Sequence, residues 1–454
     1  MKIARLFLPL TLLSAAGAAA PLQLPREAAD QVSQERIHSI VETLVSFGTR
    51  HTLSSQSDPK RGIGAALDWA AGEFGRYSRT CGNCLTIARP FDTVTGRRVP
   101  APTRVSDVLA IQKGNVDPNR VVIISGHIDS RVTDVMNATA DAPGANDDGS
   151  GTAAVIEAAR VLSQHKFPYT IVYAVLDGEE QGLLGGKILA DYATAQGWEV
   201  IAGLNNDIIG NSCGSDGVCD DAHVRVFSEG PRWQGGDSLR APQRSLGGEN
   251  DAPSRNISRW IDGLADGLGL GLDVRQIWRN DRFGRGGDHS ELLAAGFPAV
   301  RITVAIENYN WQHQDLRTEN GIAYGDTIER MDFPYLRKVV QLNVAALAAL
   351  ASAPQPPEPK VEGAVSSDTS LAWQPVKGAA SYIVRWRPTD AANWTSSLRV
   401  PAPATGQVLK GVRVDDFVFG VSSVSADGFE SPVASAVPGG AFRPYAPPPA
   451  GAKN

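Results

Sequence analysis

The chain has 454 residues, of which 42% are hydrophobic and 20% are charged, and this is the composition of an ordinary globular protein with enough residues for two domains. The formal net charge is −6, and the Lys and Arg residues are scattered along the chain. This charge pattern argues against nucleic acid as a partner, because binding to nucleic acid needs clustered positive charge.

The first twenty residues have the pattern of an export signal. Lys2 and Arg5 precede an apolar stretch over residues 6–13, and Ala20 ends a run of three alanines that is typical of a cleavage site. No later apolar run reaches the roughly 18 residues that a membrane helix needs. We therefore predict a secreted or periplasmic protein that is cleaved after Ala20 and has no stable membrane insertion.

The four cysteines form two close pairs, Cys81 with Cys84 and Cys213 with Cys219. Export to an oxidising compartment favours disulfides over thiols, so we predict one local bridge within each pair. A zinc site made of all four cysteines is the alternative, although only the first pair has the spacing of a zinc knuckle. A thioredoxin-like role is disfavoured, because no suitable strand precedes Cys81.

Helices and strands alternate over the first 350 residues. Periodicity and apolar runs predict helices over residues 31–47, 62–77, 152–163, 181–196, 254–268 and 334–351, and strands over 105–112, 121–125, 169–176, 199–209 and 299–304. The run 121–124 is apolar throughout, which is typical of a central strand that is buried on both faces. This order predicts an α/β fold with a mixed, largely parallel central sheet flanked by helices. The polar residues 230–254 are predicted to form a loop or lid.

A proline-rich stretch at residues 352–359 indicates a semi-rigid linker and a domain boundary. Short alternating runs beyond it predict a β-sandwich of about 80 residues. The segments 371–373, 381–386 and 418–432 resemble a fibronectin type III domain, and we interpret their aromatic residues as core rather than as a ligand platform. The sequence does not indicate a partner for this sandwich. The predicted divisions are a signal peptide (1–20), a first domain (21–353), a linker (354–360), the sandwich (361–438) and a proline-rich, disordered tail (439–454).

Two adjacent carboxylates, Glu179 and Glu180, follow the predicted strand 169–176 directly. The end of a buried strand is where α/β enzymes place their active sites. Neighbouring carboxylates repel one another unless a cation holds one of them. Asp207 ends the next predicted strand in the same way, although an ordinary strand-end aspartate is the alternative at that position.

Two further segments place metal-binding residue types at strand ends. His127 follows the central strand, and Asp129 lies two residues on, so both side chains project to the same face of an extended backbone. One ring nitrogen of His127 can then bind a metal while the other donates to Asp129. Asp147 lies in a glycine-bracketed turn before a predicted helix, and Asp148 or Ser150 can cap that helix, which leaves Asp147 free to bind metal.

Together with a late histidine, these segments resemble peptidase family M28, the group of zinc peptidases that includes aminopeptidases with paired metal ions. The resemblance covers roughly residues 36 to 350 and rests on five motifs in the family's order. These are Gly-His-Ile-Asp at 126–129, Gly-Ala-Asn-Asp-Asp-Gly-Ser-Gly at 144–151, Asp-Gly-Glu-Glu-Gln-Gly-Leu-Leu-Gly at 177–185, Asn-Asn-Asp at 205–207 and Asn-Trp-Gln-His-Gln-Asp at 310–315.

The resemblance implies a role for each residue of the site. Two zinc ions, exchangeable with cobalt or manganese, are held by His127, Asp147, Glu180, Asp207 and His313. Asp147 bridges the ions and begins a cis peptide bond to Asp148. Glu179 is the general base and Asp129 assists catalysis behind His127. His289 matches a family segment that lies near the site without binding metal.

Charge and chemistry agree with this set. The three ligand carboxylates carry a total charge of −3 and two zinc ions carry +4, so a bridging hydroxide makes the site neutral. A base must reach the activated water without being a ligand itself, so base and ligand must be different carboxylates. Some members of the family have a tyrosine directly before the last histidine as an oxyanion donor. Here that residue is Gln312, and Tyr309 or Trp311 is the alternative donor.

The implied function is that of an exported zinc exopeptidase acting on peptides or proteins. Aminopeptidase activity is favoured, because the predicted catalytic domain is short and has no evident insert. A carboxypeptidase is the alternative, because Arg282, Arg285 and Arg301 could hold a substrate carboxylate. A glutaminyl cyclase with one zinc and an inactive binding protein are further alternatives.

Overall fold

The computed structural model describes residues 22–230, 250–437 and 440–441. The predicted signal peptide, most of the predicted loop or lid and most of the predicted tail lie outside these ranges. Gly440–Ala441, which lie within the predicted tail, form the short strand β20, and this strand pairs with β19 (Ala434–Val437).

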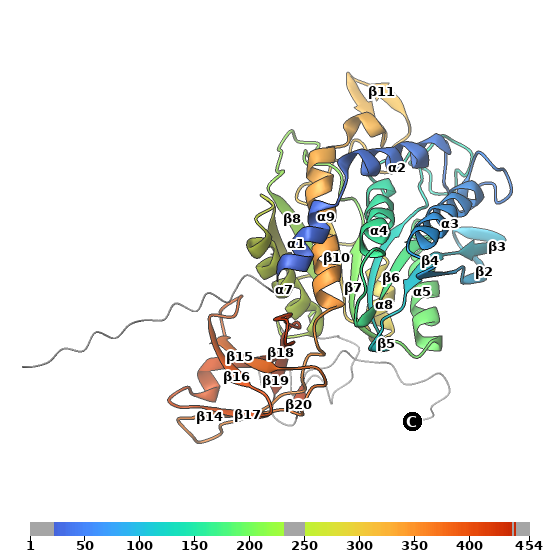
Figure 1. Cartoon of the computed structure of the whole chain (residues 1–454). Coiled ribbons are helices and arrows are strands. Elements are labelled where there is room, and N and C mark those ends of the chain that lie inside the picture. The colour runs from blue at the N-terminus through green and yellow to red at the C-terminus, as the bar shows by residue number, and fades with distance from the viewer. Residues whose placement is uncertain (1–21, 231–249, 438–439, 442–454) are drawn as a thin grey trace, which may run out of the picture.

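An eight-stranded mixed sheet is the centre of the larger part of the chain (Figure 1). The strands in spatial order are β1 (Leu85–Ala88), β4 (Val108–Gln112), β6 (Tyr169–Leu176), β5 (Asp117–His127), β7 (Glu199–Asn206), β10 (Ala299–Val304), β8 (His223–Ser228) and β9 (Asp273–Ile277). The four central strands β6, β5, β7 and β10 are parallel, whereas β1, β4 and β8 pair with a neighbour in antiparallel fashion. The predicted fold class, a mixed and largely parallel sheet, is confirmed.

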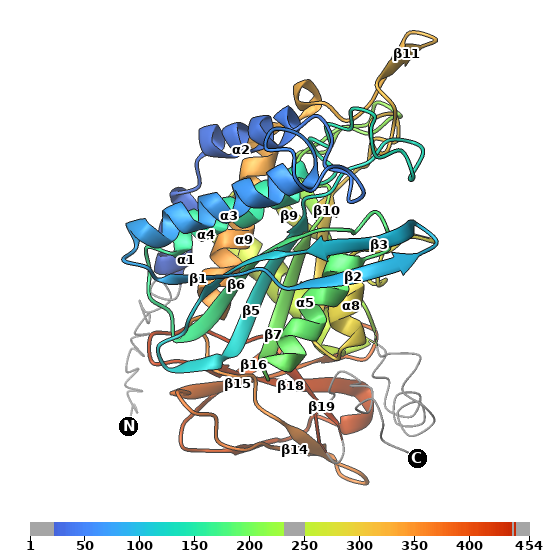
Figure 2. The ribbon, with the colours of Figure 1, turned by 90° about the vertical axis from the view of Figure 1, so that its right-hand side faces the viewer.

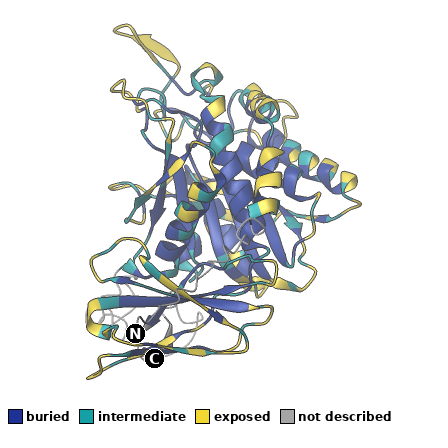
Figure 3. Cartoon of the chain, turned by 60° about the vertical axis from the view of Figure 1, so that its left-hand side comes forward, coloured by how far each residue is buried: buried dark blue, intermediate teal, exposed yellow. Residues whose placement is uncertain are grey.

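Helices cover both faces of this sheet (Figure 2). One face packs against α1 (Gln23–Asp30), α2 (Gln34–Ser46), α3 (Ile63–Thr80), α4 (Gly149–Leu162), α7 (Pro253–Leu268) and α9 (Phe333–Leu350). The other face packs against α5 (Leu184–Ala195) and α8 (His289–Ala294). β6 is buried at every position and β5 is buried from Arg120 onward, and most of these residues are apolar, which explains why these two strands lie in the middle of the sheet (Figure 3).

Parallel strands place their carboxyl ends on the same edge of a sheet. The chain therefore leaves β5, β6 and β7 on one side, and the short hairpin of β11 (Arg317–Glu319) and β12 (Ile322–Tyr324) projects from this end (Figures 1 and 3). The amino ends of the strands lie at the opposite end, next to the C-terminal part of the chain (Figure 1). Side chains that follow β5, β6 and β7 are thus brought to one edge.

The predicted strand over residues 105–112 is wrong as a single element. Its first residues belong to β3 (Val99–Ser106), which forms a separate hairpin with β2 (Phe91–Gly96), and β4 begins at Val108. The break falls at the buried residue Asp107, whose Oδ1 accepts the backbone N–H of Asp177 at 3.1 Å. The predicted strand thus runs across a buried aspartate that bonds to a residue 70 positions further along the chain.

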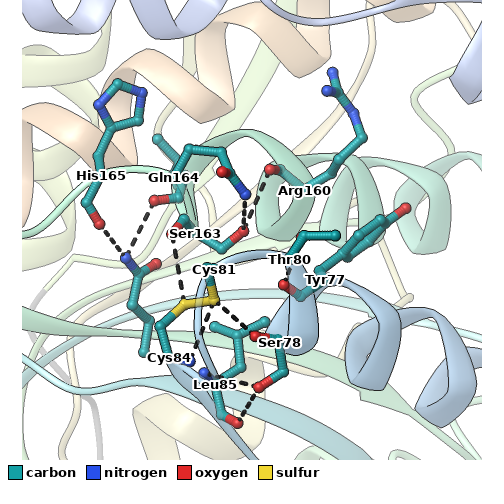
Figure 4. The surroundings of a disulfide bond; sticks show 12 residues. Tyr77, Ser78, Thr80, Cys81, Cys84, Leu85, Arg160, Ser163, Gln164 and His165 are labelled. Atoms are coloured by element: carbon teal, nitrogen blue, oxygen red, sulfur yellow. Dashed lines mark hydrogen bonds between the residues drawn. A yellow bond between two sulfur atoms is a disulfide. The ribbon is translucent and has the colours of Figure 1, made fainter.

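Both predicted disulfides are present, Cys81–Cys84 and Cys213–Cys219, so a four-cysteine zinc site does not form. The first joins Cys81, directly after α3, to Cys84, directly before β1 (Figure 4). Cys84 Sγ lies 3.4 Å from the carbonyl oxygen of Ser163, the residue that ends α4, and the N–H of Cys84 donates to Cys81 Sγ at 3.2 Å. This bridge therefore lies where the ends of two core helices meet.

The C-terminal part is a second eight-stranded β structure. Its strands are β13 (Lys360–Glu362), β14 (Thr369–Ala372), β15 (Ser381–Pro388), β16 (Ser396–Pro401), β17 (Gly406–Leu409), β18 (Phe417–Val424), β19 and β20. Trp373, Tyr382 and Phe419 are buried in its apolar core, as the interpretation of these aromatic residues required. The likeness to fibronectin type III and the domain boundaries stay predictions.

This second part is packed firmly against the first. Arg387 Nη2 contacts both carboxylate oxygens of Asp251, at 2.8 and 2.9 Å, and both side chains are buried. The indole N–H of Trp260 in α7 donates to the carbonyl oxygen of Glu430 at 3.1 Å. In the linker, Gln355 Oε1 accepts from Arg120 at 2.5 Å. The linker is thus held by the first part rather than extended as a free spacer.

None of the helices within the described ranges has the length and apolar character needed to cross a bilayer.

Candidate metal centre

His127 is the last residue of β5, and contacts on three sides hold it in place. Its backbone N–H donates to Asp148 Oδ2 at 3.0 Å, and Thr152 Oγ1 donates to its carbonyl oxygen at 2.9 Å. Its Nδ1 lies 3.3 Å from Asp129 Oδ1 and 3.1 Å from the backbone oxygen of Asp129. Asp129 thus occupies one side of the ring, and Nε2 points away from it as a potential metal ligand.

Neighbouring acidic side chains hold the backbone of the turn that carries Asp147. The Asp147–Asp148 peptide bond is cis, as the family resemblance implies. Asp148 caps α4 by accepting the N–H of Gly151 at 2.8 Å, and Asp326 Oδ2 accepts the N–H groups of Asn146 at 2.9 Å and Asp147 at 2.7 Å. The neighbouring acids therefore serve the backbone, and the carboxylate of Asp147 is left for the site.

The two oxygens of Asp147 face two different groups of residues. Asp147 Oδ1 lies 3.2 Å from His127 Nε2, which is also 3.9 Å from Asp207 Oδ1. Asp147 Oδ2 lies 2.8 Å from His313 Nε2, which is also 2.9 Å from Glu180 Oε1. Within each group the potential ligand atoms lie within 4.8 Å of one another. The structure thus brings together all five residues assigned to metal binding from the sequence, in two groups that share Asp147.

Asp129 also orients the acidic pair after β6. Its Oδ1 accepts the backbone N–H of Glu179 at 3.2 Å, and its Oδ2 accepts that of Glu180 at 3.1 Å. One buried carboxylate therefore positions His127 and both glutamates. Glu180 belongs to the second metal group, and Glu179 belongs to neither. Burial raises the pKa of Glu179 well above its ordinary value, and the charges of Glu180 and Asp207 act in the same direction.

Two arginines contact the carboxylates of the site. The sequence did not predict either contact. Arg131 Nε donates to Glu180 Oε2 at 2.8 Å, and Arg131 Nη2 lies 2.6 Å from His313 Nδ1. Arg301 Nη2 lies 2.9 Å from Asp207 Oδ1, and this arginine is fully buried. Arg131 follows Asp129 by only two residues, which is the single signal that could have indicated it.

Zinc fits this donor set. Two imidazoles and three carboxylates are the nitrogen and oxygen ligands that zinc takes in catalytic sites. Arg131 occupies Glu180 Oε2, whereas Glu180 Oε1 is buried and, within the described part of the chain, has no hydrogen-bond donor in suitable geometry. A buried carboxylate oxygen without a donor costs free energy that a cation would offset. The other four histidines lie outside both groups, as does His289.

His289 is fully buried, and its Nε2 lies 2.9 Å from the carbonyl oxygen of Asn280. Burial lowers its pKa to about 4. Its Nε2 lies 3.8 Å from Asp281 Oδ2, and Asp281 in turn lies 3.2 Å from Arg301. His289 is therefore a core histidine that lies close to the contact between Asp281 and Arg301.

The chain matches the model of peptidase family M28 over residues 107–332, a span that contains every residue of the two groups. A probable zinc metalloprotease of Leptosphaeria maculans is 43% identical over 415 residues, which cover 90% of this chain and 96% of that protein. Another, of Pyricularia oryzae, is 42% identical over 436 residues, covering 92% of this chain and 86% of that protein.

Solved structures share the fold. The LapA aminopeptidase of Legionella pneumophila superposes with a TM-score of 0.52 over 78% of this chain and 80% of that chain, at 19% sequence identity. This likeness bears on the architecture alone, whereas the family match and the zinc metalloprotease relatives bear on the chemistry. The chain belongs to peptidase family M28 and is a zinc-dependent metallopeptidase.

Proposed function

We propose that this protein is an exported aminopeptidase that removes N-terminal residues with two zinc ions. The observation that carries the proposal is the position of Asp147, with one oxygen facing His127 and the other facing His313. A carboxylate in this position can serve two ions at once.

The chain's own residues have separate tasks in this proposal. His127, Asp147 and Asp207 would hold one ion, and Asp147, Glu180 and His313 would hold the other. When bound, zinc polarises the scissile carbonyl and lowers the pKa of a water molecule.

Glu179 accepts the proton of the attacking water and delivers it to the leaving amine. Its backbone N–H is held by Asp129, which fixes the segment from which the base acts.

The surroundings of three arginines favour an aminopeptidase over a carboxypeptidase. Arg301 is fully buried against Asp207 and Asp281, so it cannot reach a substrate carboxylate. The side chain of Arg282 is 8% exposed and contacts Asp281 and Glu307. Arg285 is more open but contacts Glu307 at 3.1 Å. The cations that motivated the carboxypeptidase alternative thus have acidic partners within the protein.

Export is part of the proposal. Two disulfides are formed by all four cysteines, and this is typical of proteins in oxidising compartments.

The test combines metal analysis with a set of blocked peptides. We expect about two zinc ions per chain, cleavage of peptides with a free N-terminus, and no cleavage when the N-terminus is acetylated. Peptides blocked only at the C-terminus should be cleaved normally. The reverse dependence would indicate a carboxypeptidase, and one zinc with formation of pyroglutamate from N-terminal glutamine would indicate a cyclase.

The Glu179→Gln variant tests whether Glu179 acts as the general base rather than as a metal ligand. General-base catalysis contributes about 10²- to 10⁴-fold, so kcat should fall by at least that lower factor while zinc content is unchanged. A variant that keeps its activity, or that loses zinc together with activity, contradicts the role given to Glu179.

A further inference from the structure

Arg98 is an exposed cation at the edge of the metal centre. It lies in the turn of the hairpin formed by β2 and β3, between Gly96 and Val99, which pair with each other across the hairpin. Its Nη1 donates to the backbone carbonyl oxygen of Glu180 at 2.8 Å, and the side chain of Glu180 belongs to one of the two metal groups. A guanidinium from outside the central sheet is thus placed next to the site.

The turn that carries Arg98 is held in place. Val99, the next residue, is 2% exposed, so the turn is packed against other residues at this point. The hairpin lies beside α5, the helix that follows the acidic pair (Figure 2). Burial of Val99 and the hydrogen bond to Glu180 together fix where the guanidinium lies.

The charge of Arg98 has no acidic partner within the described residues. An arginine has five N–H donors, and in this part of the chain the side chain of Arg98 makes one hydrogen bond, to the carbonyl oxygen of Glu180. A peptide carbonyl carries no formal charge, so it orients the guanidinium without neutralising it. The positive charge and the remaining donors are therefore open to a ligand.

Two other arginines near the site are already occupied by protein atoms. Arg131 uses Nε, Nη1 and Nη2 for such contacts, and Nε donates to the carboxylate of Glu180 at 2.8 Å. Arg285 contacts the buried carboxylate of Glu307 at 3.1 Å. Arg98 differs from both, because its contact at the site leaves its charge uncompensated.

The positive charge of Arg98 indicates which part of a peptide substrate lies next to it. The free amine of an aminopeptidase substrate is itself a cation, and placing like charges together costs free energy. The amine is therefore expected to bind away from this turn, which leaves the residue after the scissile bond nearest to Arg98. A guanidinium binds a carboxylate through two parallel hydrogen bonds, so a carboxylate on that residue is the matching group.

We propose that Arg98 binds a carboxylate on the residue that directly follows the scissile bond. This inference rests on the proposed aminopeptidase function and gives it a substrate class. A dipeptide offers this group as its C-terminal carboxylate, and a longer peptide offers it as the side chain of aspartate or glutamate in the second position. In a longer peptide without such a residue, the C-terminal carboxylate lies further along the chain and does not meet Arg98.

The test measures kcat/KM of the zinc-loaded enzyme on two pairs of substrates that share one readily cleaved N-terminal residue. A dipeptide ending in alanine is compared with its amide, and a dipeptide amide ending in glutamate with the one ending in glutamine. A hydrogen bond to a charged group contributes about tenfold or more to affinity, and solvent exposure lowers this contribution. We therefore expect a preference of about tenfold for the carboxylate in at least one pair, and that pair identifies the source of the carboxylate.

Arg98→Leu should lower kcat/KM on the carboxylate substrate to that on its neutral partner, with zinc content unchanged. A purely structural role would not change this ratio. Arg97→Leu is the matched control, because it removes the same charge one residue away, and Arg97 is exposed and makes no hydrogen bond or ion pair with any described residue. Its preference should equal that of wild type. Arg98→Gln is the second variant should Arg98→Leu fail to fold.

Equal kcat/KM within both pairs for the wild-type enzyme would overturn the inference. A preference that persists in Arg98→Leu, or that Arg97→Leu loses to the same extent, would also overturn it, and so would loss of zinc in Arg98→Leu. These results differ from failure of the proposed function, which would show as a wild-type enzyme that cleaves no peptide with a free N-terminus.

Discussion

One buried ion pair, Arg387 with Asp251, contributes to the contact between the two parts of the chain, and replacing Arg387 with methionine tests how much stability it provides. The side chains of Arg387 and Asp251 are 2% and 0% exposed, and Ser435 Oγ donates a further hydrogen bond to Asp251 at 3.3 Å. Removal of one partner from a buried pair costs about 3–5 kcal/mol, because the other charge is left without compensation.

Two nearby cations place the expected effect at the lower end of this range. Arg255 and Arg259 both interact electrostatically with Asp251, and burial lowers the pKa of each to about 10. They compensate part of the charge that Arg387→Met leaves behind, so we expect a loss of about 3 kcal/mol. At about 2 °C per kcal/mol for a large domain, the melting temperature should fall by about 6 °C.

The assay is thermal unfolding of the zinc-loaded protein, with zinc content and kcat measured on the same samples. Both should be unchanged, because the interface lies at the amino ends of the central strands (Figure 1), whereas His127 of the metal groups is the last residue of β5, at the opposite end. Arg399→Met is the control, since Arg399 is exposed and should change stability by no more than about 0.5 kcal/mol. A difference of about 1 °C in melting temperature corresponds to roughly half a kcal/mol. A melting temperature for Arg387→Met within about 1 °C of wild type would therefore refute the reasoning.

Three further outcomes follow from the geometry of the site. Asp129→Asn should lower zinc affinity by about 10- to 100-fold in a chelator competition, because it weakens the support of His127. Arg131→Leu should weaken binding of one zinc more than the other, since Arg131 contacts ligands of one group only; equal loss of both ions would contradict this. Gly126→Ala should reduce zinc content and stability together, because the added Cβ would lie 2.5 Å from the backbone of Gly151 and push α4 away from β5. Unchanged zinc content in Gly126→Ala would contradict this expectation.

The order and type of the central elements could be predicted from the sequence for a physical reason. A strand buried on both faces is apolar at most positions, and β6 accordingly occupies the predicted residues 169–176. The amphipathic helices were equally recognisable, with α7 and α9 beginning and ending within one residue of prediction. The short outer strands β8 and β9 were not predicted, because their partly polar residues lack an apolar run.

The chemistry of the metal site was also contained in local sequence. Motifs at the carboxyl ends of parallel strands must meet at one edge of the sheet, so His127, Asp147, Glu180 and Asp207 could be grouped before the fold was known. The choice of His313 over His289 came from resemblance, and the burial of His289 behind Arg301 shows the physical difference between the two histidines.

Only the tertiary structure decided which charges meet. That Arg131 contacts Glu180, that Arg301 is enclosed beside Asp207, and that Arg285 contacts Gln312 all depend on side chains from separate segments. Local sequence determines how far a segment can be buried and which atoms it offers. The partner of a buried charge is set by long-range packing, which places one donor among many within reach of a given carboxylate.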